Sequence, residues 1–197
     1  GDAGGIGCWY SSPTITGCII TGNDAHWSGG ILCEFNCVSR ITNCIIAGNS
    51  ADGKGGGVGS GFNSSPTIQN CTITGNSANN SGGGLVCYKN SSATINNTIL
   101  WENVPQEISG SSSSITITYS DVQGGWKGEG NIKVDPLFED LEYHLKSCSP
   151  CINAGTPDGA PSEDIEGNSR PEGVSIDMGA YEFTKTPDVQ PKSKLAM

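Results

Sequence analysis

One short segment recurs along this chain at steps close to 27 residues. The copy at 18–23, CIITGN, returns at 44–49, at 71–76 and more loosely at 98–103, and a degenerate copy follows at 120–125. The steps between copies are 26, 27, 27 and 22 residues. An isoleucine stands three positions before each copy, and a Gly pair precedes the first four of these isoleucines by ten or eleven residues. A period this constant indicates a repeat architecture in which each unit stacks on the next.

The residue types of the repeat favour strands and turns. Its members are mainly β-branched residues, Gly and Asn, which suit extended backbone and tight bends better than helices. Three short strands joined by bends account for a period of this length, and stacked coils place equivalent residues about 4.8 Å apart. We therefore predict an all-β fold, a parallel β-helix of about four to five coils over residues 1–130.

Strand alternation predicts which side chains point into the coil. In Cys18-Ile19-Ile20, the first and third side chains should point inward and Ile19 outward. Every member of the resulting inward columns is small or aliphatic, as a narrow interior requires. The columns are Ile15/Ile41/Ile68/Ile95/Ile117, Cys18/Cys44/Cys71/Thr98/Ser120 and Ile20/Ile46/Ile73/Leu100/Val122.

Asparagine and glycine form further columns that we assign to bends. Asn tolerates left-handed backbone, and stacked side-chain amides can bond along a column. The Gly pairs are predicted to supply bends that a residue with a Cβ does not adopt. The two Asn columns are Asn43/Asn70/Asn97 and Asn23/Asn49/Asn76/Asn103.

The repeat stops after Gly125, and the chain then changes character. A stack of coils needs a cover on its open end, because that end exposes strand edges and core. We assign residues 131–183 to an irregular C-terminal cap. Residues 184–197 are rich in Pro and Lys and lack periodicity, so we expect a linker or tail there.

Four strings stand near the C-terminus: SDVQGGW at 120–126, DPLF at 135–138, SPCINAG at 149–155 and DMGAYEF at 177–183. They resemble the C-terminal region of bacterial right-handed parallel β-helix repeat proteins, which often carry a choice-of-anchor domain. The resemblance extends over nearly the whole chain up to Phe183, and it implies a right-handed helix. It also implies a large exported protein with a sorting or attachment signal after the helix, and no agreed catalytic activity.

Charge and hydropathy narrow the choice of partners. The net charge of −10 argues against nucleic acid and anionic membranes, and it is compatible with neutral glycans. No apolar run approaches the ~20 residues that span a bilayer. The chain opens inside a repeat, so we expect a fragment or mature segment of a secreted or cell-surface protein.

We expect a non-catalytic protein with a structural or adhesive role, in contact with polysaccharide or other cell-envelope components. The alternative is a fragment of a polysaccharide lyase or glycoside hydrolase, whose site would need acids gathered on one face. Acids and bases are scattered over different columns. The loops at 24–28, 50–55 and 77–81 differ most between repeats, and we call them the divergent loops. The best enzymatic grouping lies in them and consists of Asp24, His26, Asp52 and Lys54, for which solvated loop residues are the simpler interpretation.

Aromatic residues offer a candidate binding surface. Tyr10, Phe35, Phe62 and Tyr88 follow their Gly pairs, and we expect them to form one stacked column. An exposed aromatic ladder can stack on sugar rings, and it can equally cover a bend.

Metal and cysteine chemistry give two further expectations. Asp164, Glu166 and Asn168 alternate as oxygen ligands for Ca²⁺, and a cap turn with an Arg170–Asp177 ion pair is the competing interpretation. No other cofactor is expected. The pair Cys148 and Cys151 is half of a zinc motif, and a local disulfide or two separate thiols suit it better. The column Cys18/Cys44/Cys71 is predicted to hold free thiols that act as small apolar residues.

Overall fold

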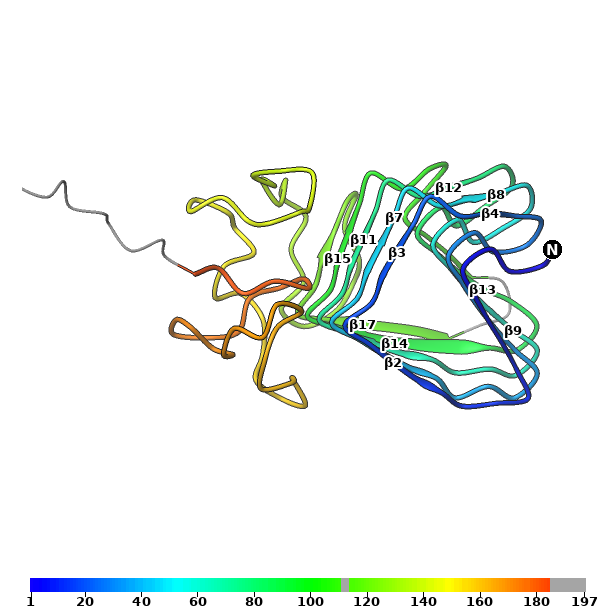
Figure 1. The fold of residues 1–197 in the computed structure, drawn as a ribbon, viewed down its shortest axis with the longest axis horizontal. Helices are drawn as coiled ribbons and strands as arrows, with labels where there is room; N and C mark the ends of the chain where they lie inside the picture. Colours follow the sequence, from blue (N-terminus) through cyan, green and yellow to red (C-terminus); the bar gives the residue numbers. More distant parts are fainter. Residues whose placement is uncertain (111–113, 185–197) are drawn as a thin grey trace, which may run out of the picture.

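The computed structural model describes residues 1–110 and 114–184, and its strands form a parallel β-helix (Figure 1). Each coil adds one strand to each of three main sheets, and neighbouring coils pair in parallel. Seen along the stack in Figure 1, the three sheets outline a triangle. Within the two described ranges the regular elements are all strands. The predicted all-β solenoid of about four to five coils is confirmed.

The strands fall into four sheets. Sheet 1 contains β1 (Ile6–Trp9), β5 (Ile31–Glu34), β9 (Val58–Gly61), β13 (Leu85–Cys87) and β16 (Ile108–Gly110). Sheet 2 contains β2 (Thr14–Thr16), β6 (Arg40–Thr42), β10 (Thr67–Gln69), β14 (Ser92–Asn96) and β17 (Ser114–Thr118). Sheet 3 contains β3 (Ile19–Thr21), β7 (Ile45–Ala47), β11 (Thr72–Thr74), β15 (Ile99–Trp101) and β18 (Asp121–Val122). The short sheet 4 contains β4 (Asp24–Ala25), β8 (Ser50–Ala51) and β12 (Ser77–Ala78).

The predicted inward columns are confirmed by the register of the sheets. Ile41 pairs with Ile15 on one side and with Ile68 on the other, and Ile46 pairs with Ile20 and Ile73. These side chains belong to one continuous core cluster. The core is therefore a set of aliphatic stacks, in which each coil buries the apolar faces of its neighbours.

The Gly pairs have a different role from the one predicted. A Cβ on Gly30 would stand 2.4 Å from the carbonyl oxygen of Gly57 in the next coil, so a side chain does not fit between the two backbones. The positive φ angles occur just before the pairs instead, at Gly55 (75°) and Gly82 (67°). The pairs are therefore glycine because adjacent coils approach closely there.

The predicted ladder of asparagine side chains is present. The amide Nδ2 of Asn23 donates to Oδ1 of Asn49 at 3.0 Å, and the same bond repeats at 2.9 Å from Asn49 to Asn76 and from Asn76 to Asn103. Glu107 ends the ladder, because its carboxylate accepts hydrogen bonds from both the backbone N–H and the side-chain amide of Asn103. Sequence reasoning did not anticipate this carboxylate. Its burial raises its pKa to about 7.

The second asparagine column has left-handed backbone, as predicted, with φ angles near 50° at Asn43, Asn70 and Asn97. These side chains do not form a comparable ladder among themselves. Each donates instead to a backbone carbonyl of the C-terminal region, those of Glu163, Asp177 and Thr156 in that order. The column is therefore the seam along which the C-terminal region is attached to the coils.

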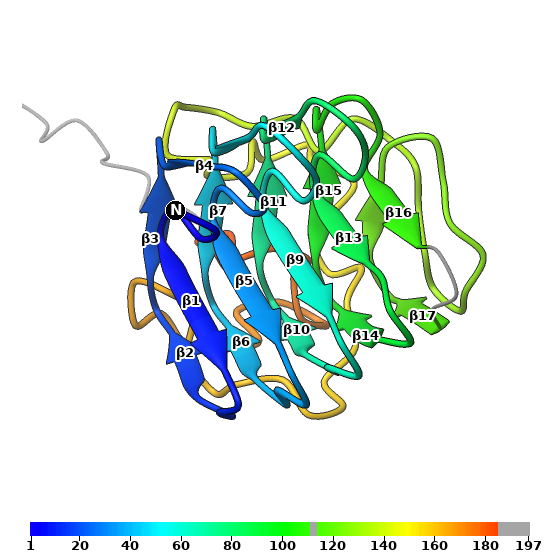
Figure 2. The same cartoon turned by 90° about the vertical axis from the view of Figure 1, so that its right-hand side faces the viewer.

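The predicted cap at 131–183 is only partly correct. Residues near the start of this segment do continue the last coil, because Ile132 pairs with Asp121 of β18. The later part lies beside the stack and covers the outer face of sheet 3, as Figures 1 and 2 show. The reason is apolar surface: Ile45 and Ile99 point outward yet are 2% and 1% exposed under this cover, whereas the equivalent Ile19 is 65% exposed.

Two remaining predictions concern the tail and the membrane. Apart from Thr184, the predicted linker or tail at 184–197 lies outside the described residues. Over the parts of the chain that the structure describes, we find no helix with the length and apolar character needed to span a bilayer.

Candidate functional site

A cleft lies on the outer face of sheet 1, on the side of the helix that faces the viewer in Figure 2. Its volume is ≈ 580 Å³, which is in the range of small-ligand sites. Aromatic, cationic and acidic side chains from all of the first four coils line it. They are Asp2, Trp27, Glu34, Lys54, Phe62, Tyr88 and Lys89, and the neutral Asn90 also lines the cleft.

The floor of the cleft is made by one long-range contact. Glu34 ends β5 and Tyr88 follows β13, so two coil steps separate them, and the position between them in β9 is Gly61. A Cβ on Gly61 would come within 2.6 Å of the Tyr88 ring, so only glycine lets the ring lie across this strand. The Tyr88 hydroxyl donates to Oε1 of Glu34. Burial, followed by the nearby Glu34 carboxylate, raises the pKa of Tyr88.

The predicted aromatic column is confirmed for its first three members. The rings of Tyr10 and Phe35 stack with centroids 5.0 Å apart, and those of Phe35 and Phe62 stack at 4.6 Å. The prediction that Tyr88 is the fourth member is wrong. The register pairs Cys87 with Ser60, so Lys89 aligns with Phe62, and it has the same left-handed backbone, with φ near 54° at both positions.

Tyr88 instead joins the column to a second aromatic element. Its ring stacks on Trp27 at 6.4 Å between centroids and meets the edge of Phe62 at 6.0 Å. Trp27 comes from the loop after β4 and is 39% exposed, so part of its side chain stays accessible to solvent. The sequence signal for this arrangement was Gly61, because it is the one residue without a side chain between Glu34 and Tyr88 in the aligned positions of sheet 1.

The chemistry of the cleft suits a polyhydroxylated ligand. Flat aromatic rings can stack on the apolar faces of sugar rings, and the amines of Lys54 and Lys89 can donate hydrogen bonds. The carboxylates of Asp2 and Glu34 can accept them. Two cations and two anions leave the lining with no net charge.

The four residues of the enzymatic grouping in the divergent loops do not form one aligned column. Asp24 pairs with Ser50 across sheet 4, whereas the backbone N–H of Asp52 bonds to the carbonyl of Ala25. The two acids therefore occupy different columns. Lys54 lines the cleft on sheet 1.

The residues predicted to bind Ca²⁺ do lie together, but they contact one another. Oδ1 of Asp164 accepts the backbone N–H groups of Glu166 and Asn168 at 2.9 and 2.8 Å. Its Oδ2 accepts the Asn168 amide at 3.0 Å and the backbone N–H of Glu182 at 2.9 Å. Four donors therefore already occupy the Asp164 carboxylate, which ties the turn to the end of the C-terminal region.

The expected Arg170–Asp177 ion pair is also wrong. Arg170 Nη1 pairs with Oε2 of Glu182 at 2.7 Å, and both side chains are buried. Asp177 uses its two oxygens to accept the backbone N–H groups of Asn153 and Phe183. The sequence places Arg170, Asp177 and Glu182 in one region of the chain. The geometry of the turns determines that Glu182, and not Asp177, contacts the guanidinium.

A histidine site in the C-terminal region was missed. His144 Nδ1 lies 2.7 Å from Asp140 and its Nε2 lies 3.3 Å from Glu166, while its ring packs 4.0 Å from that of Tyr181. Burial lowers the pKa of His144, but the hydrogen bonds and charges of Asp140 and Glu166 outweigh this and raise it overall.

All nine cysteines are free. Cys44 and Cys71 are buried, as predicted, while Cys18 is half-buried. Cys148 and Cys151 are separate thiols: the first is exposed, and the second is buried with its Sγ 3.3 Å from Oδ2 of Asp121. Of the two interpretations left open for this pair, the structure agrees with separate thiols.

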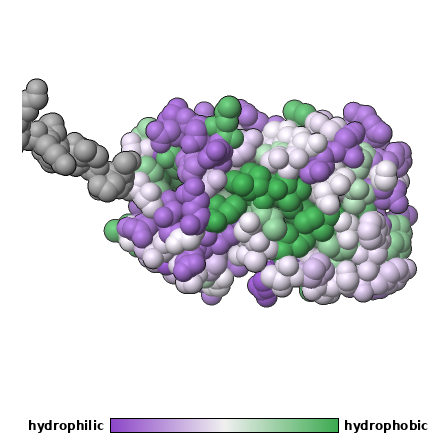
Figure 3. Space-filling view, in the orientation of Figure 1, coloured by the Kyte–Doolittle hydropathy of each residue, from purple (hydrophilic) through white to green (hydrophobic). Residues whose placement is uncertain are grey.

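A second hollow, of ≈ 790 Å³, separates the first coils from the C-terminal region. Figure 3 shows hydrophobic residues gathered in the middle of this side of the molecule. The apolar lining is contributed by Ile19, Ile45, Ala47, Leu141, Tyr143, Ile165 and Tyr181. Glu142 and Glu166 also line it, but its lining contains no lysine or arginine, unlike that of the cleft on sheet 1.

Comparison with known proteins agrees with the fold. No curated protein and no solved structure matches the chain significantly. The family model described as "Right handed beta helix region" matches residues 2–125, which cover the coils from before β1 to just after β18. The chain therefore belongs to the right-handed β-helix family.

Proposed function

We propose that this chain is a non-catalytic extracellular protein, secreted or held at a bacterial cell surface, with a structural or adhesive role that includes binding a glycan in the cleft on sheet 1. The observation that carries the proposal is the stacked pair of Trp27 and Tyr88 rings in a cleft that two lysines and two carboxylates also line. A rigid stack of coils keeps these groups in place without a ligand, which lowers the entropic cost of binding.

The charge balance favours a neutral glycan over an acidic one. The protein carries a net charge of −10, which repels a polyanion at long range, and the cleft itself has no excess of cations. Polysaccharides or other cell-envelope components with exposed sugar faces are therefore the partners we propose.

The test is binding to a panel of neutral and acidic polysaccharides, measured by affinity electrophoresis with and without Ca²⁺. We expect Trp27→Ala to weaken binding about tenfold or more, since ~1.4 kcal/mol of stacking corresponds to a factor of ten. Trp9→Ala is the matched control, because Trp9 has a similar exposure, 43% against 39%, and does not line the cleft. Equal binding by wild type and Trp27→Ala would contradict the proposal.

A polysaccharide-cleaving enzyme is the second candidate, because the Glu34 carboxylate and the Tyr88 hydroxyl meet inside the cleft. The same panel should be followed for new reducing ends and unsaturated products. Cleavage that disappears in Glu34→Gln would replace the adhesive proposal with this one.

A further inference from the structure

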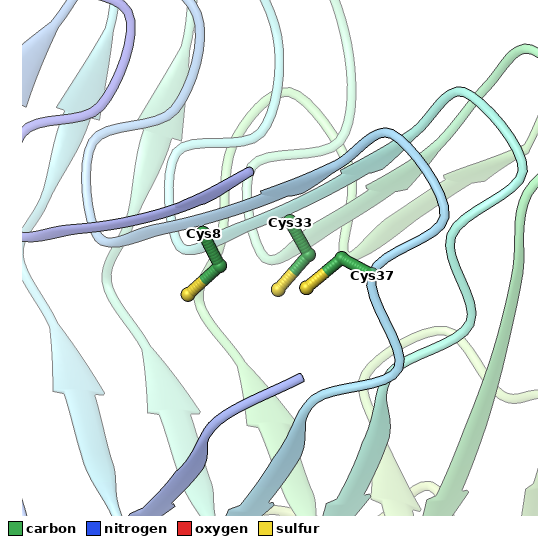
Figure 4. Close-up of side chains that lie close together, drawn as sticks. All are labelled: Cys8, Cys33 and Cys37. Carbon is green, nitrogen blue, oxygen red and sulfur yellow. The ribbon is translucent and has the colours of Figure 1, made fainter. Parts of the chain in front are cut away.

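Three cysteine side chains converge inside the first two coils, away from the cleft. Cys8 in β1 and Cys33 in β5 are directly opposite each other in sheet 1, and Cys37 approaches from the turn after β5 (Figure 4). Their Sγ atoms all lie within 4.8 Å of one another. The side chains are 3%, 0% and 0% exposed.

The cluster breaks the pattern of its own columns. In the next two coils, the position of Cys37 is held by serines, because Cys37 N–H bonds to Oγ of Ser64 and Ser64 N–H bonds to Oγ of Ser91. A thiol at this position therefore adds a third sulfur only where Cys8 and Cys33 already face the same space. Ser39 completes the surroundings, with its hydroxyl 2.9 Å from Sγ of Cys37 and 3.5 Å from Sγ of Cys33.

We propose that Cys8, Cys33 and Cys37 form a three-sulfur binding site for a soft, thiophilic metal ion, Cu(I). Three sulfurs around one ion at the metal–sulfur distance of ~2.3 Å stand roughly 4 Å apart, so small side-chain rotations close the site. Soft thiolates select Cu(I) or zinc over harder ions.

The donor set distinguishes between these two metals. Structural zinc sites use four sulfur or nitrogen ligands, and the grouping of potential ligands found here contains three cysteines and no histidine. The remaining neighbour is the Ser39 hydroxyl, which is better suited to donate a hydrogen bond to a thiolate than to coordinate zinc. The site does not depend on the glycan cleft.

The experiment uses the full chain, reduced and kept anaerobic, with Cu(I) supplied as its acetonitrile complex. Affinity is measured by competition with a Cu(I)-specific chromogenic chelator, and coordination by X-ray absorption at the copper edge. We expect one tightly held Cu(I) per chain with three sulfur neighbours at ~2.3 Å.

Two matched serine variants separate this site from the other thiols. Cys37→Ser introduces the residue that the column already carries in the next two coils, and it should weaken the tight site at least tenfold and lower the sulfur count. Cys71→Ser removes a buried cysteine from a different column, whose next members are Thr98 and Ser120, and it should leave the tight site unchanged. Equal affinity in wild type and Cys37→Ser would overturn the proposal, as would a preference of the three sulfurs for Zn(II).

Discussion

The hydroxyl of Tyr88 donates a hydrogen bond to Glu34 two coils away, and the ring reaches it by lying across Gly61. Contacts in a β-helix usually join neighbouring coils, because each coil pairs with the one before and the one after. This contact instead spans the intervening coil. Because Gly61 has no side chain, the Tyr88 ring fills its place and forms the floor of the cleft. The same ring also supports Trp27.

Gly61→Ala should dismantle this floor while keeping the fold. A Cβ would stand 2.6 Å from the Tyr88 ring, so the ring must leave and its hydroxyl must separate from Glu34. We expect glycan binding to weaken about tenfold and the pKa of Tyr88 to fall back toward ~10. The pKa is measured by ultraviolet titration, with Tyr88→Phe identifying the signal. An unchanged Tyr88 titration in Gly61→Ala would show that the contact does not control the ring.

Asn76→Ala should be strongly destabilising, because it interrupts the middle of the ladder. The Asn76 amide donates to Asn103 and to the carbonyl of Ile46, and its oxygen accepts two bonds from Asn49. Leaving these buried groups unpaired is expected to cost about 2–4 kcal/mol of unfolding free energy. Urea denaturation measures the loss. The exposed Asn80→Ala is the control and should change stability by less than about 0.5 kcal/mol.

Glu107 should make stability depend on pH. Its folded pKa of about 7 lies above its ordinary value, so the folded state holds the proton more tightly than the unfolded state does. The stability from this group is present at low pH and is lost as the pH rises through about 7. Between pH 5 and pH 8, Glu107→Gln should therefore gain on wild type by on the order of 2 kcal/mol. The free energy of unfolding of both proteins is measured by denaturation at each pH. An equal change with pH in the two proteins would contradict the assignment.

Arg170→Ala should loosen the C-terminal region. It leaves the buried carboxylate of Glu182 without its partner and frees the carbonyls of Gly179 and Ala180, to which Arg170 also donates. We expect a loss of about 3–5 kcal/mol. Hydrogen exchange over residues 150–184 locates the effect. The chain's other arginine, the exposed Arg40, provides the matched control Arg40→Ala.

His144 should titrate above its ordinary pKa of 6.5. Its positive charge is stabilised by Asp140 and Glu166, so this contribution to folding is fully present below pH 6.5 and is lost as the pH rises through the raised value. Nuclear magnetic resonance of the imidazole follows this directly, since the chain has two histidines. Asp140→Asn and Glu166→Gln should each lower the pKa, and a variant without any effect would exclude that carboxylate as a partner.

The repeat made much of this fold predictable. A residue such as Ile68 is stacked on Ile41 because both stand three places before the same segment, and the sheet register preserves that spacing. The asparagine ladder follows for the same reason. Tyr88 was misassigned because it stands one place before Lys89, the residue that aligns with Phe62. A one-residue step along extended backbone sends the side chain to the other face.

The sequence by itself determined the period, the inward columns, the asparagine ladder and the family, since parallel pairing between adjacent coils carries one coil's pattern into the next. Only the tertiary structure decided that the C-terminal region lies beside sheet 3, that Glu182 pairs with Arg170, and that the cleft draws on four coils. The first two features depend on a C-terminal region without a repeat, where no spacing in the chain relates one partner to the other. The cleft combines strand ends with loop residues such as Trp27 and Lys54, in stretches where the repeats differ most. These features form because buried apolar and charged groups must each find a complementary neighbour in space.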